Sequence, residues 1–296
     1  MDNIKQHLHH IRPTLSASSL TTYTSILKNI YFKVFNSNEI DLKKFDETDK
    51  ILAFLKDMPP NRRKTILSAL VIITDKKPYR DLMLEDVRDY NAEIKKQEKT
   101  PEQEAAWVNT SQVENVFNEL RKNADLLYKK ENLKPNDLQQ IQSFIILCLL
   151  GGVFIPPRRS KDFVDFKIKN IDKENDNYLD KNTMKFNSYK TAKTYGEQSV
   201  EVPPSLKKIL IKWIKVNPTD NLLFDSNMNK LSSVKLNQRL NKIFQGVGVK
   251  TGTNSLRHSY LTDKYQSTIK TNQALAKDMQ DMGSSTGMSS TYIKKE

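Results

Sequence analysis

The spacing of apolar residues along the chain predicts a mainly helical protein. Between Leu20 and Val34 apolar residues recur at helical spacing, and Ser16 before them is a residue type that caps helix N-termini. The same spacing recurs in three further segments, at 48–58, 61–73 and 79–96. Four short helices with brief connections predict a helical bundle over residues 14–97.

The second half of the chain mixes helical spacing with short stretches of alternation. A helix is predicted from Thr110, and the apolar run after Asp137 predicts a buried helix. Helical spacing returns in four later segments, at 206–216, 234–244, 255–265 and 272–282. Apolar and polar residues alternate with period two in three short segments, at 163–168, 184–188 and 200–202. The predicted fold class is mainly α with a small antiparallel β-sheet, in which a helical bundle precedes a mixed α/β domain.

Polar segments mark the ends of these two domains. Residues 1–13 hold three of the four histidines, His7, His9 and His10, and we expect a flexible arm there. From Lys95 to Glu104 the chain is charged, contains proline and has no apolar residue, which is typical of an interdomain linker. The expected division is an arm at 1–13, a helical domain at 14–97, a linker at 98–105 and a second domain at 106–296.

Composition narrows the cellular setting. The longest apolar stretch, 144–155, is far shorter than the roughly 20 residues of a membrane-spanning helix. The first residues lack the apolar region of a signal peptide. A single cysteine, Cys148, excludes a disulfide framework. We therefore expect a soluble intracellular protein without membrane contact.

The charge balance points to a polyanionic partner. The chain has 48 lysines and arginines against 35 aspartates and glutamates, a formal net charge of +13. Such an excess is expected of a nucleic-acid-binding protein, because each phosphate that is neutralised releases condensed counterions. The alternative is that lysine-rich faces only keep the protein soluble. Nucleic acid is therefore the expected partner, with five candidates for contacts to its backbone, Arg62, Arg63, Lys64, Arg158 and Lys193.

The sequence offers no motif for metal or nucleotide chemistry. It has no HExxH, no CxxC, no compact carboxylate cluster and no Walker-type glycine-rich loop, so we expect no cofactor. His258 is the only imidazole outside the first ten residues. Phosphoryl transfer without a metal needs fixed cations around the phosphate, a proton donor for the leaving oxygen and a protein nucleophile.

Four segments of the second half carry a resemblance to a known family. They are GGVFIPPRRSKDF at 151–163, NSYKTAKTYG at 187–196, TNSLRHSYLTD at 253–263 and DMGSSTGMSSTY at 281–292. Together they resemble the catalytic boxes of the tyrosine recombinase, or phage-integrase-like, family over about residues 110–296. The N-terminal bundle resembles the family's core-binding (SAM-like) domain in the number and placement of its helices.

The resemblance implies a site-specific recombinase from a virus or mobile element. Such an enzyme cuts and rejoins duplex DNA at a specific core site, without metal or ATP, for integration or excision. It implies a homo-oligomer, from dimer to tetramer, on DNA.

The resemblance also implies roles for two arginines. Arg257, in the segment LRHSY, matches the family's second phosphate-binding arginine. Arg159 matches the first, because Asp162 then falls at the family's acidic position, and Arg158 is the alternative. Arginine suits both positions, since its planar fork holds two phosphate oxygens and does not lose its charge.

A lysine and a tyrosine complete the implied machinery. Lys190 resembles the family's β-hairpin lysine, which protonates the leaving 5′ oxygen, and Lys193 is the alternative. Tyr292 lies 35 positions after Arg257 (292 − 257), as the family's nucleophile does, and would form a 3′-phosphotyrosyl link.

The chain departs from the family at two positions. Asn254 stands where relatives commonly have histidine. Ser284 stands where they usually have histidine or tryptophan. Both can donate a hydrogen bond to phosphate, but neither exchanges protons near neutral pH. His258 matches a further histidine of the family and is the imidazole that could orient the phosphate or the tyrosine. These departures leave a catalytically weakened DNA-binding relative as one alternative to a recombinase. A type IB topoisomerase is a second alternative, because it uses the same chemistry.

Overall fold

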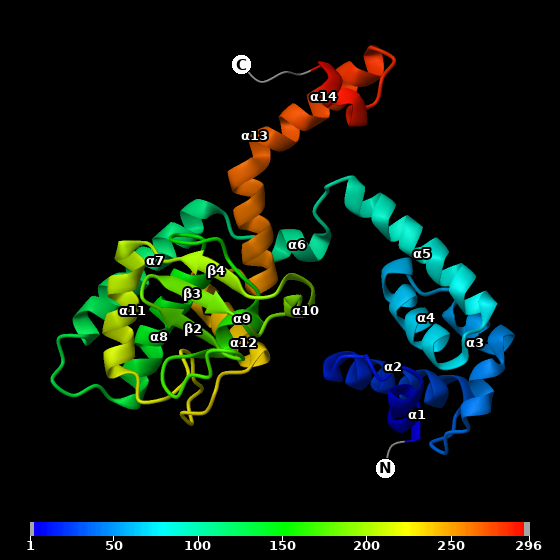
Figure 1. Cartoon of the computed structure of the whole chain (residues 1–296), viewed down its shortest axis with the longest axis horizontal. Helices are drawn as coiled ribbons and strands as arrows, with labels where there is room; N and C mark the ends of the chain where they lie inside the picture. The colour runs from blue at the N-terminus through cyan, green and yellow to red at the C-terminus, as the bar shows by residue number, and fades with distance from the viewer. Residues whose placement is uncertain (1–2, 293–296) are drawn as a thin grey trace. The chain divides into compact units, whose positions relative to one another are not determined.

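The chain divides into two compact units, each with its own hydrophobic core. The computed structural model describes residues 3–292. The units are Met1–Glu98, the N-terminal unit, and Lys99–Glu296, the C-terminal unit (Figure 1). The division falls within the charged segment 95–104.

The N-terminal unit is a helical bundle. Its helices are α1 (Asn3–Ile11), α2 (Ala17–Phe35), α3 (Thr48–Leu55), α4 (Pro60–Thr74) and α5 (Lys77–Lys95), with a 3-10 turn η1 (Leu42–Asp46). The Ser16 hydroxyl accepts a hydrogen bond from the Ser19 amide at 3.1 Å and so caps α2, as its position predicts. The predicted helices of this half are confirmed.

The expected flexible arm is wrong for residues 3–11, which form α1. Ile4 and Leu8 are both 0% exposed and belong to the core of the N-terminal unit. The two side chains are four residues apart and therefore share one face of the helix. The polar residues around them, three of them histidines, conceal this short apolar stripe in the sequence.

The expected linker at 98–105 also contains a helix, α6 (Pro101–Ala105). Thr100 Oγ1 accepts from the Gln103 amide at 3.2 Å, and Gln103 Oε1 accepts from the Thr100 amide at 2.9 Å. This capping box, with proline at the first helical position, explains why a segment without apolar residues is helical.

The C-terminal unit is built around a buried helix. Its helices are α7 (Thr110–Leu127), α8 (Pro135–Leu150), α9 (Ser160–Val164), α10 (Ala192–Tyr195), α11 (Pro204–Val216), α12 (Ser233–Ile243), α13 (Thr253–Asp281) and α14 (Ser289–Tyr292), with 3-10 turns η2 (Gln245–Val247) and η3 (Thr286–Met288). The side chains of α8 from Phe144 to Leu150 are all buried, as the apolar run predicts. Helices α7, α11, α12 and α13 pack against α8.

The sheet of the C-terminal unit is mixed, whereas the sequence predicts a purely antiparallel one. Its strands are β1 (Phe166–Lys167), β2 (Asn177–Asp180), β3 (Thr183–Phe186) and β4 (Gln198–Glu201), in that order. β1 pairs with β2 in parallel, and β2–β3 and β3–β4 pair antiparallel. The predicted strand at 163–168 is largely wrong, because Phe163 and Val164 lie in α9. β2 escaped prediction because its four residues, NYLD, show no apolar alternation.

Two predicted helices are one continuous helix in the structure. α13 covers 29 residues and includes both 255–265 and 272–282. No glycine or proline interrupts residues 266–271, so the loss of the apolar pattern there does not end the helix. Gly283 ends it, with φ of +70° and the Ser284 amide donating to the Met279 carbonyl at 2.8 Å. Figure 1 shows α13 extending beyond the rest of the C-terminal unit, with α14 at its far end.

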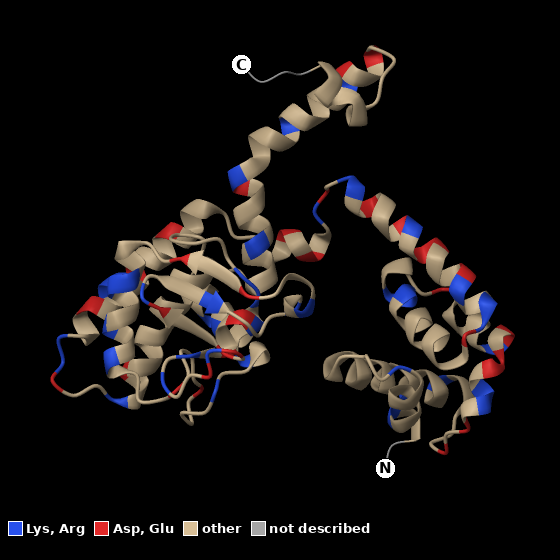
Figure 2. Ribbon diagram, in the orientation of Figure 1, with Lys and Arg blue, Asp and Glu red and all other residues tan. Residues whose placement is uncertain are grey.

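Lysine and arginine residues are distributed over the helices and loops of both units (Figure 2). On α5 they alternate along the helix with acidic residues. In residues 3–292, no helix has the length and apolar character needed to cross a membrane.

Candidate active site

Arg159 and Arg257 lie near each other in the C-terminal unit. Arg159 is the N-cap residue of α9, and Arg257 lies in the second turn of α13. Burial lowers the pKa of Arg257, and the nearby positive charge of Arg159 lowers it further. The fold thus brings together two guanidinium groups that are 98 positions apart in the sequence (257 − 159).

Within the described part of the chain, neither arginine forms an ion pair with a carboxylate. Across residues 3–292, no ion pair involves Arg159 or Arg257, and the Arg257 Nη1 atom lies 3.5 Å from Asn254 Oδ1. Asp162 is near enough to act on the pKa of Arg257, but its carboxylate is ion-paired with Arg158. Two adjacent unpaired cations favour binding of an anion with several oxygens, such as a phosphate.

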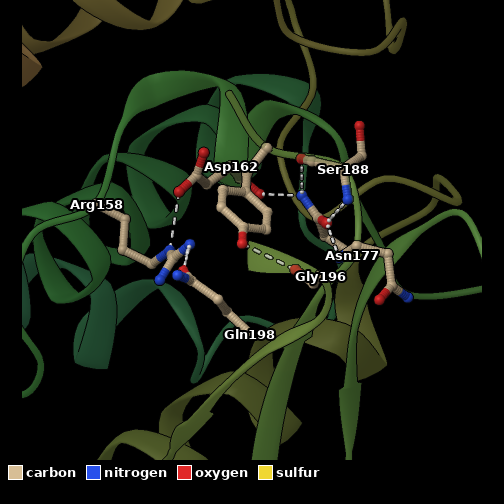
Figure 3. A network of polar contacts seen from close by, with 8 residues as sticks. Arg158, Asp162, Asn177, Ser188, Gly196 and Gln198 are labelled. Atoms are coloured by element: carbon tan, nitrogen blue, oxygen red, sulfur yellow. Dashed lines mark hydrogen bonds and ion pairs between the residues drawn. The ribbon is translucent and has the colours of Figure 1, made fainter. Parts of the chain in front are cut away.

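Arg158 is part of the interior of the unit. Its Nε atom donates to Asp162 Oδ2 at 2.8 Å, and its Nη2 atom donates to Gln198 Oε1 at 2.9 Å (Figure 3). The guanidinium carbon lies 4.0 Å from the centre of the Phe186 ring, and the side chain is only 17% exposed. This position argues against Arg158 as a contact to the DNA backbone or as the first phosphate-binding arginine.

Asp162 is a buried carboxylate surrounded by arginines. Its side chain is 2% exposed, and burial raises its pKa, while the charges of Arg158, Arg159 and Arg257 act in the opposite direction. The ion pair with Arg158 spans four positions, and α9 begins between the two residues. Asp162 therefore fixes Arg158, the neighbour of Arg159, at the start of α9.

Lys190 lies in the loop between β3 and β4, where its side chain is exposed. The preceding residue, Tyr189, is buried and donates from its hydroxyl to the Gly196 carbonyl at 2.8 Å, which closes the loop upon itself (Figure 3). The ring of Tyr189 also lies 5.6 Å from the guanidinium carbon of Arg158. Lys193, the alternative to Lys190, is exposed in α10 of the same loop.

Asn177 is a residue of this region that sequence analysis missed. It is 0% exposed at the start of β2, and its side chain makes four hydrogen bonds (Figure 3). The Nδ2 atom donates to the carbonyls of Asp162 at 2.9 Å and Ser188 at 2.8 Å. The Oδ1 atom accepts from the amides of Asn187 at 2.9 Å and Ser188 at 2.8 Å. Nothing in the segment NDNYLD distinguishes this asparagine from its polar neighbours.

The first turns of α13 also carry Asn254 and His258. Asn254 is exposed and lies one turn before Arg257, so the two side chains share a face. His258 is exposed, and as the next residue its side chain points about 100° around the helix from Arg257. Of the described residues, no group of three or more His, Cys, Asp or Glu side chains is arranged to hold a metal ion.

Ser284 and Tyr292 lie beyond the far end of α13, and the structure does not bring them to the arginines. Arg257 and Asp281 are 24 positions apart in one helix, which is about 36 Å at a rise of 1.5 Å per residue. Tyr292 is 55% exposed in α14, which packs with η3 at that end. The site therefore contains Arg159, Arg257 and Asn254, while the predicted nucleophile lies elsewhere in this conformation.

The three basic candidates of the N-terminal unit differ in their surroundings. Arg63 is ion-paired with Asp86, at 2.7 Å between Nη2 and Oδ1, and Asp86 is 0% exposed. The pair links α4 to α5, so Arg63 is not placed to contact DNA. Lys64 lies over the Tyr90 ring, and partial burial lowers its pKa. Arg62 is exposed.

No protein-family model matches the sequence, and no curated protein matches it. Several solved structures are similar at low identity. The XerA recombinase is 12% identical with a TM-score of 0.38, over 88% of this chain and 82% of that chain. The XerH site-specific recombinase in a pre-cleavage complex with its difH substrate is 16% identical with a TM-score of 0.40, over 89% and 85%. The XerH post-cleavage complex with palindromic difH is 14% identical with a TM-score of 0.41, over 89% and 84%.

Proposed function

We propose that the chain cleaves and rejoins duplex DNA as a tyrosine-type site-specific recombinase. The observation that carries the proposal is the pair of guanidinium groups of Arg159, at the start of α9, and Arg257, in α13, which lie near enough for one charge to act on the other and have no ion pair within residues 3–292. Two such forks can hold the non-bridging oxygens of one phosphate and stabilise the extra charge that develops during attack. The net charge of +13 supports DNA as the polyanion.

The proposed reaction is a transfer of the phosphate from one oxygen to another. The Tyr292 Oη atom passes its proton to the His258 imidazole or to water and forms a bond to phosphorus, while the bond from phosphorus to the 5′ oxygen breaks. Lys190 donates a proton to the leaving 5′ oxygen. The product is a 3′-phosphotyrosyl link and a free 5′ hydroxyl, and attack by a 5′ hydroxyl of another strand reverses the step. Metal and ATP are not required, since the link conserves the phosphodiester bond energy.

Tyr292 must approach the arginines for this reaction. Residues 263–268 and 270–274 of α13 are all exposed, so tertiary packing does little to hold this part of the helix straight. The tyrosine can come from the same chain, by a change in the course of α13, or from a second copy bound to the same DNA. Mixing Tyr292→Phe with Arg257→Ala distinguishes these routes, because only donation between copies restores an active site in the mixture.

His258 and Asn254 are proposed to orient the phosphate or the incoming tyrosine. Asn254 lies on the face of α13 that carries Arg257, and its amide can donate to a phosphate oxygen. Of Asn254, His258 and Ser284, only His258 carries an imidazole, the side chain that serves most often as a general base. Ser284 would act at the site only if it arrives with the segment that contains Tyr292.

The test is the formation of a covalent protein–DNA adduct. The probe is a pool of nicked duplexes with a randomised core, in which cleavage releases a short fragment and traps the enzyme on the DNA. The wild-type chain is expected to form an adduct that Tyr292→Phe lacks. Tyr265→Phe is the matched control, because Tyr265 is also an exposed tyrosine, on α13, and has no proposed role. An adduct that persists in Tyr292→Phe would show that another residue is the nucleophile.

A catalytically weakened DNA-binding protein is the second candidate. Asn254, Ser284 and the distance of Tyr292 from the arginines favour it. It predicts salt-dependent binding to duplex DNA that Arg159→Ala weakens, with no adduct on any member of the pool. A type IB topoisomerase would form the adduct but relax supercoiled DNA without exchanging strands between two duplexes, whereas a recombinase, acting as a homo-oligomer, exchanges them.

A further inference from the structure

The amide of Asn177 joins three segments of the candidate active site. It donates to the Asp162 carbonyl in α9, and it binds both the carbonyl and the amide of Ser188 in the loop after β3. Asn177 is 0% exposed, its Nδ2 atom donates two hydrogen bonds and its Oδ1 atom accepts two (Figure 3). Because every polar atom of the side chain has a partner, these bonds fix the orientation of the amide. Loss of either donor would leave a buried carbonyl without its partner.

These bonds relate two functional positions to each other. Ser188 precedes Lys190 by two residues, and Asp162 follows Arg159 by three. The far end of the loop is held to the same element, because Arg158 binds both Asp162 and Gln198. Asn177 thus links the start of the loop that contains Lys190 to α9, the helix whose N-cap residue is Arg159.

We propose that Asn177 is a positioning residue for proton transfer by Lys190. The proposal rests on the proposed function, in which Lys190 protonates the leaving oxygen of a phosphate held by Arg159 and Arg257. A general acid must lie within hydrogen-bond reach of the atom that it protonates, and an error of about 1 Å can cost about a hundredfold in rate. By fixing Ser188 to α9, Asn177 sets where Lys190 stands relative to that phosphate.

A substrate with sulfur in place of the bridging 5′ oxygen tests this role. When the phosphorus–sulfur bond breaks, the sulfur leaves as a thiolate, because the pKa of a thiol, about 8.5, is far below that of an alcohol. The step then needs no proton from Lys190. The measured quantity is the ratio of the rates of adduct formation on sulfur and oxygen substrates.

In Asn177→Ala this ratio is expected to rise about tenfold or more above that of the wild type. In Lys190→Ala it should rise by about a hundredfold or more, the usual range for loss of a general acid. Arg257→Ala should slow both substrates without changing the ratio. Because both rates come from one preparation, the ratio does not depend on the fraction of protein that is folded.

Asn187→Ala is the matched structural control. The Asn187 amide also donates two hydrogen bonds to carbonyls in this region, to Lys173 at 2.9 Å and Asp176 at 3.1 Å, but neither lies in α9. In Asn187→Ala the ratio of the sulfur and oxygen rates is expected to stay within about twofold of the wild type, because the lost bonds do not join the loop to α9. A tenfold rise in the ratio would correspond to about 1.4 kcal/mol in the barrier. Asn177→Asp is a second variant. It keeps the oxygen that accepts from the loop amides but replaces the Nδ2 donor with a second oxygen, so the bonds to the Asp162 and Ser188 carbonyls are lost.

The outcomes separate this inference from the proposed function. An unchanged ratio in Asn177→Ala and Asn177→Asp, with a raised ratio in Lys190→Ala, would overturn the positioning role and leave the proposed function standing. No adduct on either substrate with the wild type would overturn the function itself. An unchanged ratio in Lys190→Ala would show that Lys190 is not the proton donor, and would overturn the positioning role of Asn177 while leaving strand cleavage standing. In the Lys190→Ala background the additional Asn177→Ala change should leave the ratio unaltered, and a further rise there would also contradict the proposal.

Discussion

Arg158 and Arg159 are adjacent in the sequence but differ in role in the structure. The sequence alone leaves both as candidates for the first phosphate-binding arginine. The structure distinguishes them, because Arg158 pairs with the buried Asp162 while Arg159 remains unpaired among the described residues. Arg158 precedes the N-cap residue Arg159 and so lies outside α9, which means that helical spacing alone does not reveal its ion pair with Asp162.

The two arginines should respond differently to substitution. Arg158→Ala leaves the buried Asp162 carboxylate without its partner and should lower the free energy of unfolding by about 3 to 5 kcal/mol. Arg159→Ala removes an exposed side chain and should change it by less than about 0.5 kcal/mol. Urea denaturation of the two variants checks this. Equal stability losses would contradict the assignment of Arg158 to the interior.

The candidate site was predictable only in part. Arg257, Asn254 and the Lys190 loop come from local motifs, and the fold brings the segments of Arg159 and Arg257 together. Asn177 could not be found, because a buried amide is recognised by its four partners and not by its neighbours in sequence. The distance of Tyr292 from the arginines depends on the course of α13, which the spacing of motifs does not determine.

The sequence predicts correctly the helices that have a strong apolar pattern. α2, α8 and α11 each bury an apolar face or run, so burial and propensity favour the same structure. The errors concern elements held by other means. α6 depends on a capping box, β2 on its neighbours in the sheet, and the middle of α13 on helix propensity alone.

The middle of α13 should open more readily than its first turns. Leu256 and Ser259 are buried in the C-terminal unit, whereas residues 263–268 and 270–274 are exposed. Local stability follows burial, so amides at 266–274 should exchange with deuterium at least tenfold faster than those at 256–262. Hydrogen exchange with mass spectrometry measures both. Equal protection along the helix would contradict a change in the course of α13 as the route for Tyr292.

Helix α1 should contribute to the stability of the N-terminal unit. Leu8→Ala removes a fully buried side chain and should lower the free energy of unfolding by about 2 to 5 kcal/mol. His9→Ala, on the exposed side of the same helix, should have little effect. Thermal unfolding of the two variants gives the comparison. If Leu8→Ala unfolds like the wild type, residues 3–11 do not pack on the bundle.

At the scale of the whole molecule, the pattern of apolar residues located both units and the small sheet between helices. It could not give the parallel pairing of β1 with β2, because that pairing joins residues eleven positions apart, such as Phe166 and Asn177. The net charge of +13 supports DNA as the partner, and the two arginines without an ion pair in residues 3–292 support the binding of a phosphate, so the two observations bear on different parts of the proposal. A source in a virus or mobile element, recognition of a specific core site and assembly of two to four copies on DNA stay predictions.

The most direct measurement is the identity of the residue that becomes linked to DNA. After incubation with the nicked duplex pool, the adduct is digested with protease and nuclease, and mass spectrometry locates the attached nucleotide. The account predicts a nucleotide on Tyr292, carried by its 3′ phosphate, and a loss of the adduct in both Arg159→Ala and Arg257→Ala. A nucleotide on any other residue, or an adduct that forms undiminished without the two arginines, would contradict it.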